Sequence, residues 1–220
     1  MLILNLKTYT ESTGSNIYNI FDSLNSEIEN NPRLAELVVA APSNIYLADL
    51  KNKYSKVKIA SQTVSSKSAG STTGWIPADN LISLGLDLAI YNHSENRQNM
   101  DTIVEDIKDI QAKGIRLVVC CENVTEANKI LEANPFAIAY EPKDLIGSGI
   151  SVTTRPEAVT EFIKTIKGKT MAIIGAGVST GEDVANSLKL GAEGVLLASA
   201  YVKAEDKSAK LLELATPFLG

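Results

Sequence analysis

Short apolar runs alternate with amphipathic stretches along the whole chain. The runs are rich in Val, Ile, Leu and Ala, which is typical of strands buried on both faces of a parallel sheet. They predict strands over residues 2–5, 37–41, 57–61, 88–92, 115–120, 136–140, 170–174 and 194–198. Apolar residues at helical spacing predict helices over residues 15–29, 43–51, 77–84, 100–112, 125–133, 156–167, 181–189 and 207–218.

Several predicted helices have recognisable ends. Thr154 and Thr180 stand where a helix-capping hydroxyl is expected. Glycines follow the ends of four predicted helices, where a left-handed residue is common: Gly85, Gly114, Gly168 and Gly191.

Eight strand–helix units in 220 residues favour an α/β fold of the (β/α)8 barrel class, with eight parallel strands ringed by helices. A doubly wound sheet is the alternative, but it more often has a glycine-rich nucleotide loop after its first strand. Here the segment after that strand is Asn5-Leu6-Lys7-Thr8-Tyr9, without such a motif. No linker or low-complexity tract interrupts the chain, so we expect residues 1–220 to form one catalytic domain.

Composition and charge indicate which kinds of binding partner suit this chain. Apolar residues make up 45% and charged residues 21%, as in ordinary globular proteins, and no apolar run is long enough to cross a membrane. A net charge of −5 without a Lys/Arg cluster argues against nucleic acid or a membrane as a partner. Cys120 and Cys121 are adjacent in a predicted strand, so we expect two separate buried thiols and a reducing, cytoplasmic location.

Candidate chemistry gathers at the predicted strand ends, where barrel enzymes place their active sites. The first strand leads to Asn5 and Lys7, the fourth to Asn92-His93-Ser94-Glu95, and the sixth to Tyr140-Glu141-Pro142. The seventh leads to Gly175-Ala176-Gly177 and the eighth to Ala198-Ser199. Each has an ordinary structural interpretation as a solvated lysine, a loop histidine or acid, or a tight turn. Their joint placement favours a common site.

This set of groups suits proton transfer next to a carbonyl. A carboxylate can remove the proton, while an imidazole or ammonium stabilises the enediolate oxygen that develops. Glycine-rich turns expose backbone N–H groups that bind phosphate. The segment Pro142-Lys143-Asp144-Leu145-Ile146-Gly147-Ser148-Gly149 is typical of a lid that excludes water from such an intermediate.

Three motifs in this order give the chain a family resemblance: Asn92-His93-Ser94-Glu95-Asn96-Arg97, Tyr140-Glu141-Pro142 with Ile146-Gly147-Ser148-Gly149, and Gly175-Ala176-Gly177-Val178-Ser179-Thr180-Gly181-Glu182-Asp183. Together they resemble the triosephosphate isomerase family, and its short archaeal branch in particular. The resemblance covers the whole chain. It implies conversion of dihydroxyacetone phosphate to D-glyceraldehyde 3-phosphate, a step of glycolysis and gluconeogenesis, without metal or organic cofactor.

The resemblance also implies residue roles. Glu141 would be the base, His93 the neutral electrophile and Lys7 the source of positive charge, while Asn5 orients the substrate and Glu95 orders Lys7. The residues expected to bind the substrate phosphate, largely through their backbone, are Ile146, Gly147, Ser148, Gly177, Ala198 and Ser199.

The resemblance implies a homodimer or homotetramer, in which the loop from Ser66 to Pro77 inserts into a neighbouring subunit. Thr73 would then approach the partner's active site, and Trp75 is either an interface anchor or a local packing residue. One departure concerns the lid, where many family members have an aliphatic–Trp pair and this chain has Lys143-Asp144. These charges alter the hinge of the expected lid.

Two rival functions follow from the same fold. Another phosphosugar isomerase or epimerase would use the same barrel, but a metal-dependent one would need several ligands, and His93 is the only histidine. A non-catalytic barrel that binds phosphorylated ligands is the other rival. A pure binder has no need of the base Glu141.

Overall fold

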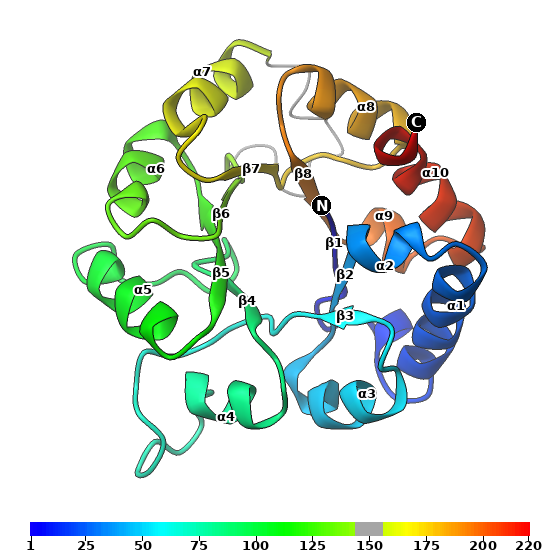
Figure 1. Ribbon diagram of the computed structural model, residues 1–220, viewed down its shortest axis with the longest axis horizontal. Helices are drawn as coiled ribbons and strands as arrows, with labels where there is room; N and C mark the ends of the chain where they lie inside the picture. The colour runs from blue at the N-terminus through cyan, green and yellow to red at the C-terminus, as the bar shows by residue number, and fades with distance from the viewer. Residues whose placement is uncertain (144–155) are drawn as a thin grey trace.

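The computed structural model describes residues 1–143 and 156–220 and contains eight parallel strands arranged around a central axis (Figure 1). The strands are β1 (Leu2–Asn5), β2 (Val38–Ala41), β3 (Lys58–Ile59), β4 (Leu88–Tyr91), β5 (Arg116–Cys121), β6 (Ala137–Tyr140), β7 (Met171–Ile174) and β8 (Gly194–Leu197). Each predicted apolar run therefore overlaps a strand, and only β5 extends beyond its run, by one residue. Their order in the sheet is β3-β2-β1-β8-β7-β6-β5-β4.

The edge strands of this sheet, β3 and β4, are joined by hydrogen bonds just beyond the end of β3. Ser61, just beyond β3, forms a parallel bridge with Ala89 of β4. Its N–H donates to the Leu88 carbonyl at 3.0 Å, and its carbonyl accepts from Ile90 at 2.8 Å. These bonds close the sheet into the predicted (β/α)8 barrel.

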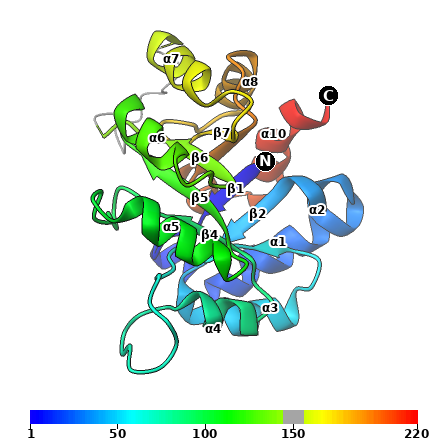
Figure 2. The same cartoon turned by 60° about the vertical axis from the view of Figure 1, so that its left-hand side comes forward.

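Helices ring the barrel, as Figures 1 and 2 show from two directions. The α-helices are α1 (Asn16–Asn30), α2 (Arg33–Leu37), α3 (Leu47–Lys53), α4 (Ala78–Ser83), α5 (Ile103–Ala112), α6 (Val124–Leu131), α7 (Pro156–Ile166), α8 (Gly181–Lys189), α9 (Ser199–Val202) and α10 (Lys207–Leu219). Two 3-10 helices, η1 (Thr10–Ser12) and η2 (Asn44–Tyr46), lie in the loops after β1 and β2. Within the described residues, no helix is both long enough and apolar enough to cross a membrane.

The helix ends follow the sequence signals. Thr180 caps α8 through a reciprocal pair of hydrogen bonds with Asp183, which is a capping box. All four glycines expected after helices have positive φ angles, between 70° and 103°. Thr154, the other expected cap, lies outside the described residues, although α7 does begin at Pro156.

The core has two layers because side chains alternate across each strand. Ile3 points into the barrel and packs with residues such as Val118 and Ile173, whereas Leu2 and Leu4 face the helices. Cys120 belongs to the inner layer and Cys121 to the outer one, and both are free and fully buried. The prediction of two separate buried thiols is therefore confirmed.

Three local differences from the predicted elements concern short segments. Leu37 was expected to begin a strand but ends the five-residue helix α2, which starts after Pro32. The predicted helix over residues 43–51 begins instead with the 3-10 turn η2. Helix α9, only four residues long, follows β8 and was not predicted. Elements of about one turn do not contain enough residues for a periodic pattern.

Candidate active site

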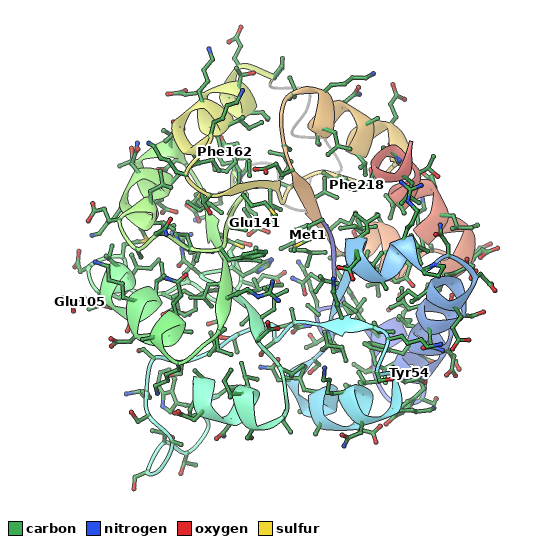
Figure 3. The ribbon with its side chains drawn as sticks, in the orientation of Figure 1. Met1, Tyr54, Glu105, Glu141, Phe162 and Phe218 are labelled. Atoms are coloured by element: carbon green, nitrogen blue, oxygen red, sulfur yellow. The ribbon has the colours of Figure 1, made fainter. Side chains whose placement is uncertain are left out.

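Glu141 stands at the mouth of the barrel, directly after β6. Its backbone N–H donates to the Cys121 carbonyl of β5 at 2.8 Å, which extends the strand pairing to this residue. The residue is only 3% exposed. Figure 3 shows its side chain inside the ring of strands, whereas Glu105 lies at the periphery on α5. Glu141 is therefore a carboxylate removed from bulk water at the position expected for a catalytic group.

The surroundings of Glu141 make it a stronger base than an exposed glutamate. Burial raises the pKa of its carboxyl, because the charged form loses its hydration. The His93 side chain opposes this most strongly, and the Cys120 thiol, the Ser94 backbone N–H and Lys7 also favour the charged form. The net result is a raised pKa, which increases the affinity of the carboxylate for a proton.

His93 lies next to Glu141 in the site. Its Nε2 lies 3.4 Å from Glu141 Oε1. The backbone N–H of Glu95 donates to His93 Nδ1 at 3.2 Å, so Nδ1 is an acceptor. A neutral ring in this position carries its proton on Nε2, which directs a hydrogen-bond donor into the site.

Lys7 is held in an uncommon backbone conformation at the end of β1. Its φ is +47°, in the left-handed region that residues other than glycine rarely adopt. Its backbone N–H donates to Asn5 Oδ1 at 3.1 Å, and its Nζ donates to Glu95 Oε1 at 2.7 Å. The Asn5 amide in turn lies 3.5 Å from His93 Nε2. These contacts join the residues predicted after the first and fourth strands into one group.

Gln62 also supports Lys7 and was not predicted. Its Nε2 donates to the carbonyls of Lys7 at 3.0 Å and Ala41 at 2.9 Å, which uses both amide hydrogens. Gln62 comes just after the third predicted strand. The rule that places chemistry at strand ends points to this position, but not to its contacts with Lys7 and Ala41.

Gly175 also has a role that was not predicted, because it leaves room for the Glu141 side chain. A β-carbon at this position would lie 2.6 Å from Glu141 Cγ and 3.0 Å from Oε1. Glycine is therefore required here by the close approach of the Glu141 side chain rather than by a turn.

A cavity of about 480 Å³ connects these groups. Lys7, His93, Glu95 and Glu141 line it. The residues from β7, β8 and the loops after them that line it include Gly177, Ala198 and Ser199. Asn5 lines an adjoining cavity of about 270 Å³ that also reaches Lys7 and His93. The other predicted phosphate-binding residues, Ile146, Gly147 and Ser148, lie outside the described residues.

Metal ligands are not grouped in the part of the chain that the structure describes. Among residues 1–143 and 156–220, no cluster of three or more His, Cys, Asp or Glu side chains could hold a metal ion. The described site offers groups for proton transfer in Glu141 and His93, which lie 3.4 Å apart, and positive charge in Lys7.

This chain is similar in sequence to proteins of one known family. The family described as triosephosphate isomerase matches residues 1–216. The chain belongs to the triosephosphate isomerase family. Similar curated proteins, each named triosephosphate isomerase, come from Methanobrevibacter smithii (36% identity, covering 97% of this chain and 96% of the relative) and Archaeoglobus fulgidus (36%, 97% and 96%). Another, from Thermoplasma volcanium, is 34% identical and covers 93% of this chain and 94% of the relative.

The family match confirms the resemblance drawn from the three motifs, and near-full coverage confirms that it spans the chain. The triosephosphate isomerase family is a family of isomerases, so the enzyme class predicted from the sequence is confirmed.

Proposed function

We propose that this protein interconverts dihydroxyacetone phosphate and D-glyceraldehyde 3-phosphate. The main support is the contact between His93 Nε2 and Glu141 Oε1 at 3.4 Å, in a cavity that Lys7 also lines. A base of raised pKa beside an N–H donor and an ammonium group is suited to forming and stabilising an enediolate.

The reaction needs one base and one group that serves the two oxygens. Glu141 removes a proton from the carbon bearing the hydroxyl, and the electron pair moves to the neighbouring carbonyl, whose oxygen is stabilised by His93 and Lys7. His93 protonates that oxygen and takes the proton of the other, after which Glu141 returns its proton to the adjacent carbon. Protons and electrons balance without oxidant or metal.

Other residues that line the cavity suit the phosphate. Gly177 has a φ of +66°, and the helix α9 begins at Ser199 immediately after Ala198. Backbone N–H groups in glycine turns and at helix starts bind phosphate oxygens. We assign Gly177, Ala198 and Ser199 to the substrate phosphate, with Ile146, Gly147 and Ser148 remaining predictions from the sequence.

The test is a coupled assay of the purified protein with D-glyceraldehyde 3-phosphate. Wild type should convert the substrate rapidly. Glu141→Gln should lose at least about a hundredfold in kcat, because general-base catalysis is removed. Glu105→Gln is the matched control, since Glu105 is exposed on α5 away from the cavity, and it should keep wild-type activity.

Three results would contradict the proposal. If folded wild type binds a phosphorylated analogue but converts nothing, the non-catalytic barrel is favoured. If Glu141→Gln is as active as wild type, another group is the base. Conversion that a chelator abolishes would favour a metal-dependent phosphosugar enzyme.

We further propose that the protein self-associates through the loop between β3 and α4, as a homodimer or homotetramer. This loop extends away from the barrel in Figures 1 and 2, and Trp75 on it is 54% exposed. Ile45, in η2, is 80% exposed. Large apolar side chains at such exposure are stabilised when a partner covers them. Sedimentation of wild type and Trp75→Ala tests this, and a monomeric wild type would contradict it.

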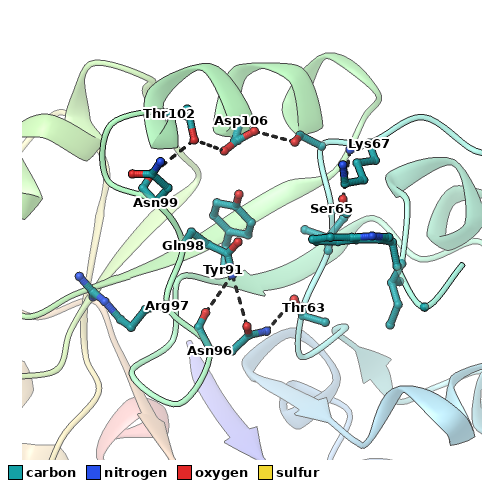
Figure 4. A pocket seen from close by; sticks show the side chains of 15 residues that line it. Thr63, Ser65, Lys67, Tyr91, Asn96, Arg97, Gln98, Asn99, Thr102 and Asp106 are labelled. Atoms are coloured by element: carbon teal, nitrogen blue, oxygen red, sulfur yellow. Dashed lines mark hydrogen bonds between the residues drawn. The ribbon is translucent and has the colours of Figure 1, made fainter. Parts of the chain in front are cut away.

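The same loop forms a wall of a second cavity of about 550 Å³ (Figure 4). Ser66, from the loop, donates to Asp106 Oδ1 of α5 at 2.6 Å, and Thr102 donates to Asp106 Oδ2 at 2.9 Å. Lys67 Nζ lies 4.9 Å from the centre of the Trp75 ring. These contacts hold the base of the loop against the barrel and leave Thr73 and Trp75 accessible to a second subunit.

A cytoplasmic location is part of the proposal. The thiols of Cys120 and Cys121 are free and buried on opposite faces of β5, which is compatible with a reducing compartment. Fractionation of cells would test it, and recovery of the protein outside the cytoplasm would contradict it.

A further inference from the structure

We propose that Asn92 is a positioning residue that sets the orientation of His93, an inference that rests on the proposed function. Asn92 follows β4 directly, precedes His93 and is 1% exposed. Its φ is +57°, in the left-handed region. The chain therefore turns sharply at the residue before the electrophile.

The Asn92 side chain bonds to β5 at the point where backbone pairing between β4 and β5 ends. The register of β4 and β5 ends at the pair Tyr91 and Val119, so the next pair would be Asn92 and Cys120. Instead, Asn92 Nδ2 donates to the Cys120 carbonyl at 2.8 Å. The side-chain amide thus anchors the left-handed residue to β5.

The same side chain closes the loop that carries the catalytic groups. Asn92 Oδ1 accepts from the backbone N–H of Gln98 at 2.9 Å. The segment from Asn92 to Gln98 carries His93 and Glu95, and this bond joins its two ends. One buried amide therefore fixes both ends of this loop relative to β5.

The anchor on β5 matters because that strand also positions the base. The Cys121 carbonyl, next to Cys120, accepts the backbone N–H of Glu141 at 2.8 Å. Asn92 thus ties His93 to the strand against which Glu141 is held. The 3.4 Å separation between the His93 and Glu141 side chains depends on both connections.

Asparagine suits both demands of this position. It tolerates the left-handed region better than most residues, and its amide offers one donor group and one acceptor. Glycine meets the backbone demand but has no side chain. Aspartate keeps an acceptor for the Gln98 N–H but places a charged oxygen against the Cys120 carbonyl.

The main test compares Asn92→Gly with Asn134→Gly. Asn134 also has a left-handed backbone, with a φ of +48°, but it is exposed in the loop after α6. Both variants replace a left-handed asparagine with glycine, so backbone strain is relieved in each. Only the first removes side-chain bonds to the catalytic loop.

Two readouts distinguish positioning from general stability. His93 is the only histidine, so the imidazole nitrogen-15 signals of labelled protein report on it alone. Asn92→Gly should shift these signals and lower kcat about tenfold or more, while KM changes less than threefold, because misplacing a reacting group mainly affects the transition state. Asn134→Gly should match wild type in both.

Asn92→Asp serves as the second variant if Asn92→Gly fails to fold. It keeps the acceptor for Gln98, so its kcat should fall between wild type and Asn92→Gly, with a shifted His93 signal. Unchanged imidazole signals and a kcat within twofold of wild type in either folded variant would overturn the inference. An inactive wild type with His93 signals that still shift in Asn92→Gly would instead count against the proposed function alone.

Discussion

Gly175 lies so close to Glu141 that a β-carbon would come within 2.6 Å of the Glu141 Cγ. The two residues follow β6 and β7, and the Gly175 N–H donates to the Tyr140 carbonyl at 2.9 Å. The residue after the neighbouring strand β7 therefore forms the wall against which the Glu141 carboxylate rests. A side chain at position 175 has to displace that carboxylate.

We expect Gly175→Ala to lower kcat by about a hundredfold, since a displacement of the order of 1 Å costs this much when it affects a reacting group. Gly194→Ala is the control. A β-carbon there would be equally crowded, 2.6 Å from the Met1 carbonyl, but at the start of β8 and so at the opposite end of the barrel. The control should lose stability and keep its kcat. Equal kcat in Gly175→Ala and wild type would show that Glu141 does not need this wall.

The raised pKa of Glu141 predicts how stability depends on pH. The folded protein holds the Glu141 proton more tightly than the unfolded chain, whose pKa is near 4.5. The group therefore contributes stability below pH 4.5, and this contribution is lost as pH rises through the folded pKa. Glu141→Gln should gain stability relative to wild type between pH 4 and pH 7, measured by denaturant unfolding. A stability difference that is the same at both pH values would contradict the assigned shift.

The same shift predicts the pH dependence of activity. Glu141 must be ionised to act as base, so the acid limb of kcat/KM should fall above pH 4.5. Lys7 is among the groups that favour the ionised form, so Lys7→Met should move this limb to higher pH. A pH–rate profile of both proteins checks the direction, and a limb that moves to lower pH in the variant would be inconsistent with it.

Lys7→Met should also weaken binding of a phosphorylated substrate analogue by about 10- to 100-fold, the range for loss of one charge-assisted hydrogen bond. Lys56→Met is the control, because Lys56 pairs with Glu29 at 2.9 Å on the surface. Calorimetric titration measures both. Equal affinities would remove Lys7 from substrate binding.

Most of the barrel could be predicted because its signals are local. Strand β1 and helix α8 have the bounds that the pattern predicts, Leu2–Asn5 and Gly181–Lys189. Once eight strand–helix units are counted, the strand-end rule brings Lys7, His93 and Glu141 to one rim without any knowledge of distances.

Other features could not be predicted from local patterns. Some elements are too short, and some contacts depend on which strands lie side by side. The short helices α2 and α9 are too brief for a periodic signal. The contact between Gly175 and Glu141 arises only when β6 and β7 pair. The role of Gln62 likewise requires the ends of β1, β2 and β3 to lie together.

Gln62 provides a final test, because its amide supports the left-handed backbone of Lys7. Gln62→Leu keeps the approximate size of the side chain but removes both donors to the carbonyls of Lys7 and Ala41. We expect KM for the triose phosphate to rise about tenfold, since the backbone that directs Lys7 loses its support. Gln111→Leu is the matched control: Gln111 is also partly buried and donates from Nε2 to a backbone carbonyl, that of Ala133 at 2.9 Å, but it lies on α5. If the two variants have the same KM as wild type, Lys7 keeps its conformation without Gln62.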